Sequence, residues 1–132
     1  MLITDAVHDE IVVKKSGMPG AAEVAQAPWI QKTSVANRSI MDVLPSVLHE
    51  GEREAIALAK EQDAQLLVDE IRARRVASEL GLDVIGTLRI LAEAKRLGHI
   101  DVVRPLVARM QSSGYRFDRT LIREFLERLS EA

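Results

Sequence analysis

Apolar positions recur with two different periods along this chain, and the alternation between them predicts an α/β protein. Residues 52–62 repeat apolar side chains with helical spacing, and residues 65–68 form an apolar run too short for a helix. The change repeats, because a helical pattern at 70–80 precedes an apolar run at 82–85, and a further helix follows at 88–97. This order is typical of parallel βαβ units. We therefore predict helices packed on a short parallel sheet.

Capping residues mark the ends of several predicted elements. Gly81 follows the second of these helices, where a glycine commonly ends a helix. Thr87 is predicted to be the N-cap of the next helix. The chain then continues with two more helical segments, 101–112 and 118–130, and Asp118 is the expected N-cap of the last.

The N-terminal third has a weaker pattern. Residues 2–3 predict a strand stub before a helix at 5–13, and residues 30–35 predict another strand. Residues 14–27 contain glycine and proline and predict a loop that includes one helical turn. Pro45 interrupts the next apolar stretch, because proline lacks the amide that a continuous helix needs.

Length and composition favour one cytoplasmic domain. The chain has 132 residues, of which 47% are hydrophobic and only 3% aromatic, so we predict a single domain, 1–132, with an aliphatic core. The absence of cysteine excludes disulfides and sulfur-based zinc sites. Because neither a signal peptide nor a membrane span is visible, we expect a soluble cytoplasmic protein with no membrane partner.

Charge is unevenly distributed along the chain. Residues 1–85 carry nine basic and fourteen acidic side chains, a net charge of −5, whereas residues 86–132 carry nine and six, a net charge of +3. Such a division suits a metal site beside a phosphate-binding rim, and it equally suits ordinary solvated helix faces.

Three acids are candidates for one metal site. Asp69 follows the strand at 65–68, and ligands of open parallel sheets bind beyond the carboxyl ends of the strands. Glu54 lies on the preceding helix, and Glu10 lies on the first. Carboxylates repel one another unless a hard cation such as Mg²⁺ or Mn²⁺ neutralises them. The alternative is structural, with Asp69 as the N-cap of the next helix and Glu70 in its first turn.

The basic and histidine side chains give weaker evidence for a functional site than the acids do. Arg72, Arg74 and Arg75 are candidates for nucleic-acid phosphate contacts, although such a run on a helix is often only an exposed face. The three histidines have no partner at metal-ligand spacing, and we expect them on the surface: His8, His49 and His99.

Several motifs between Leu48 and Ile100 occur together in a fixed order, and they carry a family resemblance. They are GEREAIALA, LLVDE followed by RRVA, LGLDVIGT, and AKRLGHI. This block resembles the bacterial and archaeal PIN-domain-like family of predicted nucleic-acid-binding proteins. The opening MLITDAVHDEI is similar to that family's second strand and acid-bearing helix, and the tail after Gly114 is similar to its C-terminal helix.

The resemblance implies a three-layer α/β/α sandwich with a short parallel sheet and extra C-terminal helices. It implies a relation to the VapC toxin ribonucleases, which use an acidic cluster with Mg²⁺ or Mn²⁺ to cut single-stranded RNA. Single-stranded RNA and an antitoxin protein are then the expected partners. Glu10, Glu54 and Asp69 match the acids of that cluster. If the register is shifted, their equivalents are the neighbours Asp9, Glu52 and Glu70.

This chain departs from the family at its start. The family begins with a central strand that ends in a metal-binding Asp and then a helix, and the sequence starts after both, so it resembles an N-terminally truncated PIN fold. Three explanations are open: the gene start is placed too late, the remaining strands close up around the gap, or a second copy of the chain fills the edge. An exposed sheet edge favours the last, so we expect a homo-oligomer. Two functions follow, a metal-dependent ribonuclease or a catalytically inactive binding or interaction module. A small-molecule site at Thr87 lacks specific support.

Overall fold

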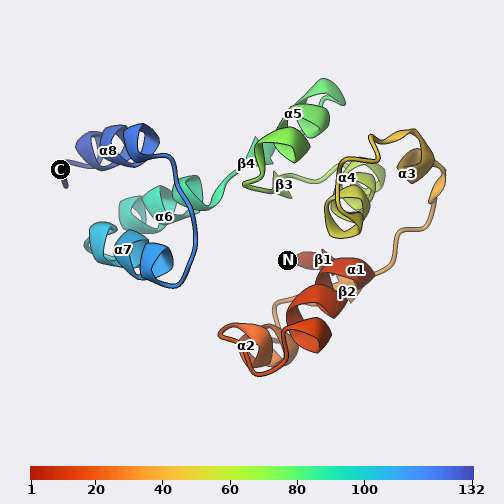
Figure 1. Cartoon of the computed structure of the whole chain (residues 1–132), viewed down its shortest axis with the longest axis horizontal. Coiled ribbons are helices and arrows are strands. Elements are labelled where there is room, and N and C mark those ends of the chain that lie inside the picture. The colour runs from red at the N-terminus through yellow and green to blue at the C-terminus, as the bar shows by residue number, and fades with distance from the viewer. The chain divides into compact units, whose positions relative to one another are not determined.

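The computed structural model describes residues 1–132 and forms two compact units, Met1–Ile85 and Gly86–Ala132. Figure 1 shows the elements of each unit. The first unit contains short strands, helices and one π-helical segment, η1, in this order: β1 (Leu2–Thr4), α1 (Asp5–His8), η1 (Asp9–Lys14), α2 (Ala21–Gln26), β2 (Gln31–Thr33), α3 (Ser39–Val43), α4 (Glu50–Gln62), β3 (Leu66–Leu67), α5 (Ile71–Glu79) and β4 (Val84–Ile85). The second unit contains three helices, α6 (Thr87–Arg96), α7 (Arg104–Ser112) and α8 (Arg119–Arg128).

The strands confirm the predicted mixed α/β fold with parallel pairing. They form two separate two-stranded parallel sheets, β1 with β2 and β3 with β4. The expected strand at 30–35 is confirmed as β2, and the βαβ unit at 65–85 is confirmed as β3, α5 and β4. The remaining strands do not close into one sheet, because β1 and β3 do not pair. Each sheet therefore keeps an unpaired edge.

Helix α4 is the centre of the first unit. It contacts α1, α3, α5, β1 and β3, and it buries four consecutive apolar side chains, Ile56 to Ala59. On one side Ile56 and Ala59 pack with Leu66 and the alanines of α5. On the other, Ala57 and Leu58 pack with Val35 and Met41. The five consecutive apolar residues 55–59 cover more than one helical turn, so this part of α4 presents apolar side chains on both sides.

Two of the predicted N-caps are wrong by one residue. Asp69 does not cap α5. The N-cap is Glu70, whose carboxylate accepts from the Ala73 amide at 2.8 Å. The start shifts because the chain stays extended after β3, where the Val68 amide still donates to the Ile85 carbonyl. Thr87 is the first residue of α6, and Gly86 is its N-cap.

The other boundary predictions need smaller changes. Asp118 is confirmed as the N-cap of α8, because its carboxylate accepts from the Leu121 amide at 2.9 Å. The predicted first helix is present as α1 followed by η1, with a π-helical second half that the apolar pattern did not indicate. Within the predicted loop at 14–27, residues 21–26 form helix α2. Helix α3 ends at Val43, before Pro45.

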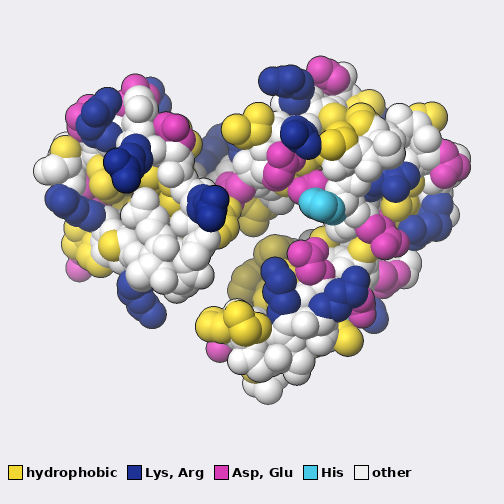
Figure 2. Space-filling view, viewed as in Figure 1, with side chains coloured by type: hydrophobic (Ala, Val, Ile, Leu, Met, Phe, Trp, Pro, Cys, Tyr) yellow, Lys and Arg dark blue, Asp and Glu magenta, His cyan; other side chains and the backbone are white.

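The second unit is held by a carboxylate near the end of the chain. Glu131 accepts from the Lys95 ammonium at 2.7 Å and from the amides of Val103 and Arg104, so it links α6 to the start of α7. Val103, whose amide is one of these donors, and Val107 are buried. Figure 2 shows Lys and Arg side chains spread over the visible face of this unit. No helix in either unit combines the length and apolar character that crossing a membrane requires.

Candidate functional site

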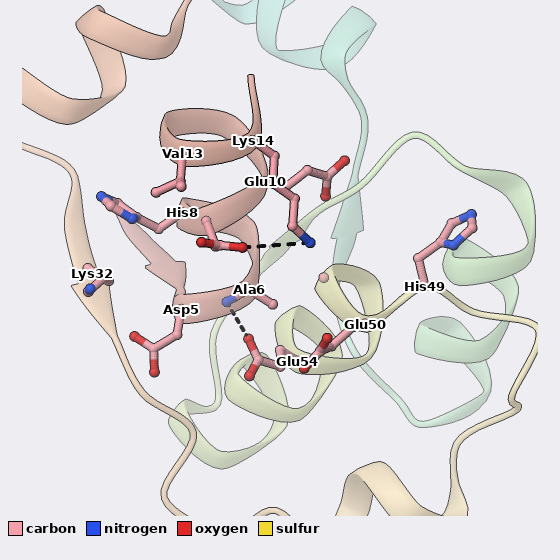
Figure 3. A pocket seen from close by; sticks show the side chains of 12 residues that line it. Asp5, Ala6, His8, Glu10, Val13, Lys14, Lys32, His49, Glu50 and Glu54 are labelled. Atoms are coloured by element: carbon pink, nitrogen blue, oxygen red, sulfur yellow. Dashed lines mark hydrogen bonds and ion pairs between the residues drawn. The ribbon is translucent and has the colours of Figure 1, made fainter. Parts of the chain in front are cut away.

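A pocket of about 820 Å³ opens in the first unit where α1 and η1 meet the start of α4. Five acidic side chains from these elements line it, and all but Asp9 are labelled in Figure 3, together with His8, His49, Lys14 and Lys32. The acids are Asp5, Asp9, Glu10, Glu50 and Glu54. Two segments about forty residues apart in sequence thus place their negative charges in the same pocket.

The local sequence explains how the first segment reaches this place. Helix α1 begins directly after β1, and the hydroxyl of Thr4 caps it by accepting from the Val7 amide at 3.3 Å. The chain then widens into η1, and π-helical turns of this kind are frequent at functional sites. Gly51 allows a close approach of α4, since a Cβ there would lie 3.3 Å from Oε2 of Glu10.

Glu54 is the buried member of the pocket. Its side chain is only 4% exposed. One carboxylate oxygen accepts from the Ala6 amide at 2.7 Å, the contact drawn in Figure 3. The other accepts from Nη1 of Arg38 at 3.0 Å. A buried carboxylate requires such partners, because an unpaired charge is costly to remove from water.

Most of the other acids also have partners within the chain. Asp9 lies 3.6 Å from Lys14, and Glu10 lies 3.8 Å from Lys15. Asp5 accepts from the hydroxyl of Ser34 at 2.6 Å. Each of these three acids thus has a partner within the chain, but the two ion pairs are exposed to solvent and weak.

The arrangement does not fit a metal ion as it stands. No three acidic or histidine side chains lie in positions from which they could hold one ion. Figure 3 agrees, since the labelled carboxylates do not point toward a common centre. Mg²⁺ needs near-octahedral oxygen ligands, and the two oxygens of Glu54 already serve Ala6 and Arg38. A metal at this pocket would therefore require these contacts to rearrange.

The structure brings together two of the three predicted acids. Glu10 and Glu54 line the pocket, and so does Asp9. Asp69 is not among the lining residues. It lies half-buried after β3. Of the acids expected only if the register is shifted, Glu52 accepts from the His49 amide at 2.9 Å, and Glu70 caps α5. A catalytic role for Asp69 stays a prediction.

The three candidate arginines lie together on α5. Arg72 and Arg75 are exposed, whereas Arg74 is partly buried and donates to the Val68 carbonyl at 2.9 Å. None of them lines the acidic pocket. Arg74 therefore holds the end of β3, whereas the other two are exposed, with Arg72 close enough to the Glu70 carboxylate to lower its pKa. Their role with nucleic acid also stays a prediction.

Several pocket residues were missed by the sequence reasoning, namely Asp5, Glu50, His8, His49, Lys14 and Lys32. A signal existed for two of them. Asp5 and Asp9, like Glu50 and Glu54, are four residues apart, and this spacing places both members on one helix face. His8 and His49 were expected on the surface without a role, but both line the pocket. No spacing pattern connects them, because they come from different helices.

Comparison with protein families identifies the class of this chain. The family model for the PIN domain matches residues 1–131, which is nearly the whole length. The chain therefore belongs to the PIN domain family. Comparisons with curated proteins and with solved structures gave no significant match.

Proposed function

We propose that the protein binds single-stranded RNA, and that the acidic pocket is the place where a ribonuclease reaction would occur. The observation that carries this proposal is the gathering of five acids from α1, η1 and α4 in one pocket of a PIN domain protein. The carboxylates repel an RNA backbone, and Lys32, which lines the same pocket, offers it positive charge. Lys14 also lines the pocket and can add to this charge when it leaves its exposed ion pair with Asp9. Arg72 and Arg75 on α5 are further proposed contacts.

Mg²⁺ or Mn²⁺ is the proposed cofactor of the cutting reaction. The support is the family, whose members are typically metal-dependent, and the oxygen chemistry of the pocket. In the arrangement described above the acids are bound to internal partners, so we expect cutting by the unmodified chain to be weak. A toxin role with a cognate antitoxin belongs to the same proposal and rests on the VapC resemblance alone.

RNA cleavage tests the proposal directly. The purified chain is incubated with end-labelled single-stranded RNA and Mn²⁺, beside Glu10→Gln, Asp69→Asn and the control Glu93→Gln, which changes an exposed acid of the second unit. We expect slow cutting that Glu10→Gln removes and Glu93→Gln preserves. No cutting by the unmodified chain rejects the ribonuclease function. Equal cutting by Glu10→Gln moves the reaction away from this pocket, and a loss in Asp69→Asn would give that residue a role.

A second candidate function is an inactive interaction module, and the unpaired sheet edges favour it. The amides of Leu66 and Val68 donate to β4, so the amide and carbonyl of Leu67 face the other edge of β3, where no strand pairs. Leu67 is 43% exposed there. Such an edge is a template for a strand from another chain. We propose that a second copy pairs here to give a homo-oligomer.

The oligomeric state tests this second candidate. Light scattering after size-exclusion chromatography should give a mass that rises above the 14.6 kDa monomer as concentration increases. Leu67→Lys places a charge on the edge and should return the protein to the monomer. Leu121→Lys, at a 51% exposed leucine of the second unit, is the matched control. A monomer at every concentration contradicts this candidate.

A further inference from the structure

A short segment between β2 and α3 holds acids from three places in the first unit. Ser34 donates its hydroxyl to Asp5 at 2.6 Å, and the amides of Ala36 and Asn37 donate to the carboxylate of Glu61 at 3.0 and 2.9 Å. Arg38 then reaches Glu54 at 3.0 Å. Glu54 and Glu61 are seven residues apart and so share one face of α4. The backbone just before Arg38 is therefore held to α4 through Glu61, on the same helix face as the Glu54 that Arg38 reaches.

The turn itself is closed before α3 begins. The side-chain oxygen of Asn37 accepts from the amide of Ser39 at 3.0 Å and from its hydroxyl at 2.6 Å. Arg38 is the N-cap residue of α3 and has a right-handed helical backbone. The Arg38 side chain is 53% exposed, whereas the Glu54 side chain that it meets is 4% exposed. The segment thus places the positively charged guanidinium of Arg38 against the buried carboxylate of Glu54.

This contact occupies the acid that a divalent ion would need. The Ala6 amide holds one oxygen of Glu54 and the guanidinium holds the other. A metal ion bound to the same carboxylate would lie within a few ångströms of the guanidinium, and two cations at that distance repel strongly in a partly desolvated place. Arg38 and a metal ion therefore exclude each other at Glu54.

We infer that Arg38 is the internal counter-ion of the acidic pocket, and that it keeps Glu54 from binding a divalent cation. This inference deepens the proposed function, because it explains why the pocket of a PIN domain protein does not fit a metal ion. Arg38 is a positioning residue, since it acts through Glu54 and does not line the pocket. Displacing its side chain frees one oxygen of Glu54 toward the acids around it.

Mn²⁺ binding by variants of the full chain tests the inference. Arg38→Gln removes the charge, and we expect its Mn²⁺ affinity, measured by calorimetry and by electron paramagnetic resonance, to rise by about tenfold. Without metal its unfolding temperature should fall, because Glu54 loses its counter-ion. Added Mn²⁺ should raise that temperature more than it does for the unmodified chain. If the ion pair had only a structural role, its loss in Arg38→Gln would lower stability without increasing the response to Mn²⁺.

Three further variants make the result specific. Arg96→Gln removes an arginine from an exposed ion pair with Glu93 and should leave Mn²⁺ binding unchanged. Arg38→Gln with Glu54→Gln should lose the gained affinity. Arg38→Lys keeps a charge without the planar fork of Arg, so its hold on Glu54 is weaker and its Mn²⁺ affinity should be intermediate. This variant decides the question if Arg38→Gln does not fold.

The outcomes separate this inference from the proposed function. If Arg38→Gln and Arg38→Lys bind Mn²⁺ no more tightly than the unmodified chain, the inference is overturned, even where the unmodified chain cuts RNA and the proposed function stands. If neither the unmodified chain nor any variant binds Mn²⁺, the inference is likewise overturned. Tighter binding by Arg38→Gln supports it, whether or not the unmodified chain cuts RNA.

Discussion

At the scale of single residues, the buried carboxylate of Glu54 contributes to stability through its two partners. Glu54→Gln keeps an acceptor for the Ala6 amide but leaves Arg38 without its acid. Because the Arg38 side chain is about half exposed, water can solvate part of its unpaired charge. We therefore expect the free energy of unfolding to fall by about 1–3 kcal/mol. Urea denaturation measures it.

The matched control for this change lies one helical turn away. Glu50 also lines the pocket but is exposed in the first turn of α4. Glu50→Gln should change the free energy of unfolding by no more than about 0.5 kcal/mol. Equal effects of the two substitutions would show that the contacts with Ala6 and Arg38 do not stabilise the fold.

The lowered pKa of Glu131 predicts that the stability of the fold depends on pH. The hydrogen bond from Lys95 is the main cause that lowers its pKa from 4.5 to about 2, and the amides of Arg104 and Val103 act in the same direction. A lowered pKa means that the folded state favours the charged form. The stabilisation that charged Glu131 gives the folded state is therefore complete above about pH 4.5 and is lost as the pH falls toward about 2.

Thermal unfolding followed by circular dichroism across this pH range tests the prediction. Glu131→Gln cannot ionise, so the part of the decline that belongs to this group should disappear in the variant. Glu127→Gln, at an exposed acid of α8, serves as the control and should retain the decline. Parallel curves for Glu131→Gln and the unmodified chain would contradict the assignment.

At the scale of elements, α4 and the α1 and η1 pair meet at Gly51. Gly51→Ala should gain up to about 1 kcal/mol of helix stability, because glycine is a poor residue within a helix. The new methyl group would lie 3.3 Å from Oε2 of Glu10 and 3.4 Å from Cγ2 of Val7. The flexible Glu10 side chain can move aside, so we expect a modest net rise in the unfolding temperature.

The same substitution should displace Glu10 within the pocket, and the gain in stability should be accompanied by weaker RNA cutting where cutting is present. Gly51→Ala combined with Glu10→Gln separates the two effects, since the double variant should keep the rise in unfolding temperature. A fall in the unfolding temperature would show that α1 and η1 cannot yield at this contact.

Elements with a strong apolar period were predictable from sequence. Helices α4 and α5 and strands β3 and β4 follow their predicted positions closely, because their burial is set by residues within each segment. The π-helical form of η1 was not predictable, since the same apolar spacing fits an α-helix. The cap at Glu70 was missed because it depends on how far β3 continues, which its partner β4 decides.

The site was predictable only where one helix determines it. The spacing of Glu50 and Glu54 is a property of α4 alone, so sequence could have grouped them. The partner of Glu54 is Arg38, and this pairing depends on the turn that Glu61 fixes through two backbone amides. The place of Asp69 depends on how β3 lies relative to α1. Such relations between separate elements leave no pattern in one sequence.

At the scale of the whole molecule, net charge and local contacts make different predictions for RNA binding. Arg72→Gln with Arg75→Gln and Arg119→Gln with Arg123→Gln each remove two positive charges from a chain of net charge −2. All four arginines are exposed, the first pair on α5 and the second on α8. Near physiological salt, charges more than about 8–10 Å from the RNA are screened, so equal net charge does not produce equal effects.

Only arginines that touch phosphates release counter-ions from the RNA. If Arg72 and Arg75 are contacts, their double variant should reduce the slope of log affinity against log salt concentration by about 1.4 for single-stranded RNA. The Arg119 and Arg123 variant should leave that slope nearly unchanged. Fluorescence anisotropy across a salt series measures both. An unchanged slope in the first variant would remove α5 from the RNA surface, and a reduced slope in the second would move that surface to α8.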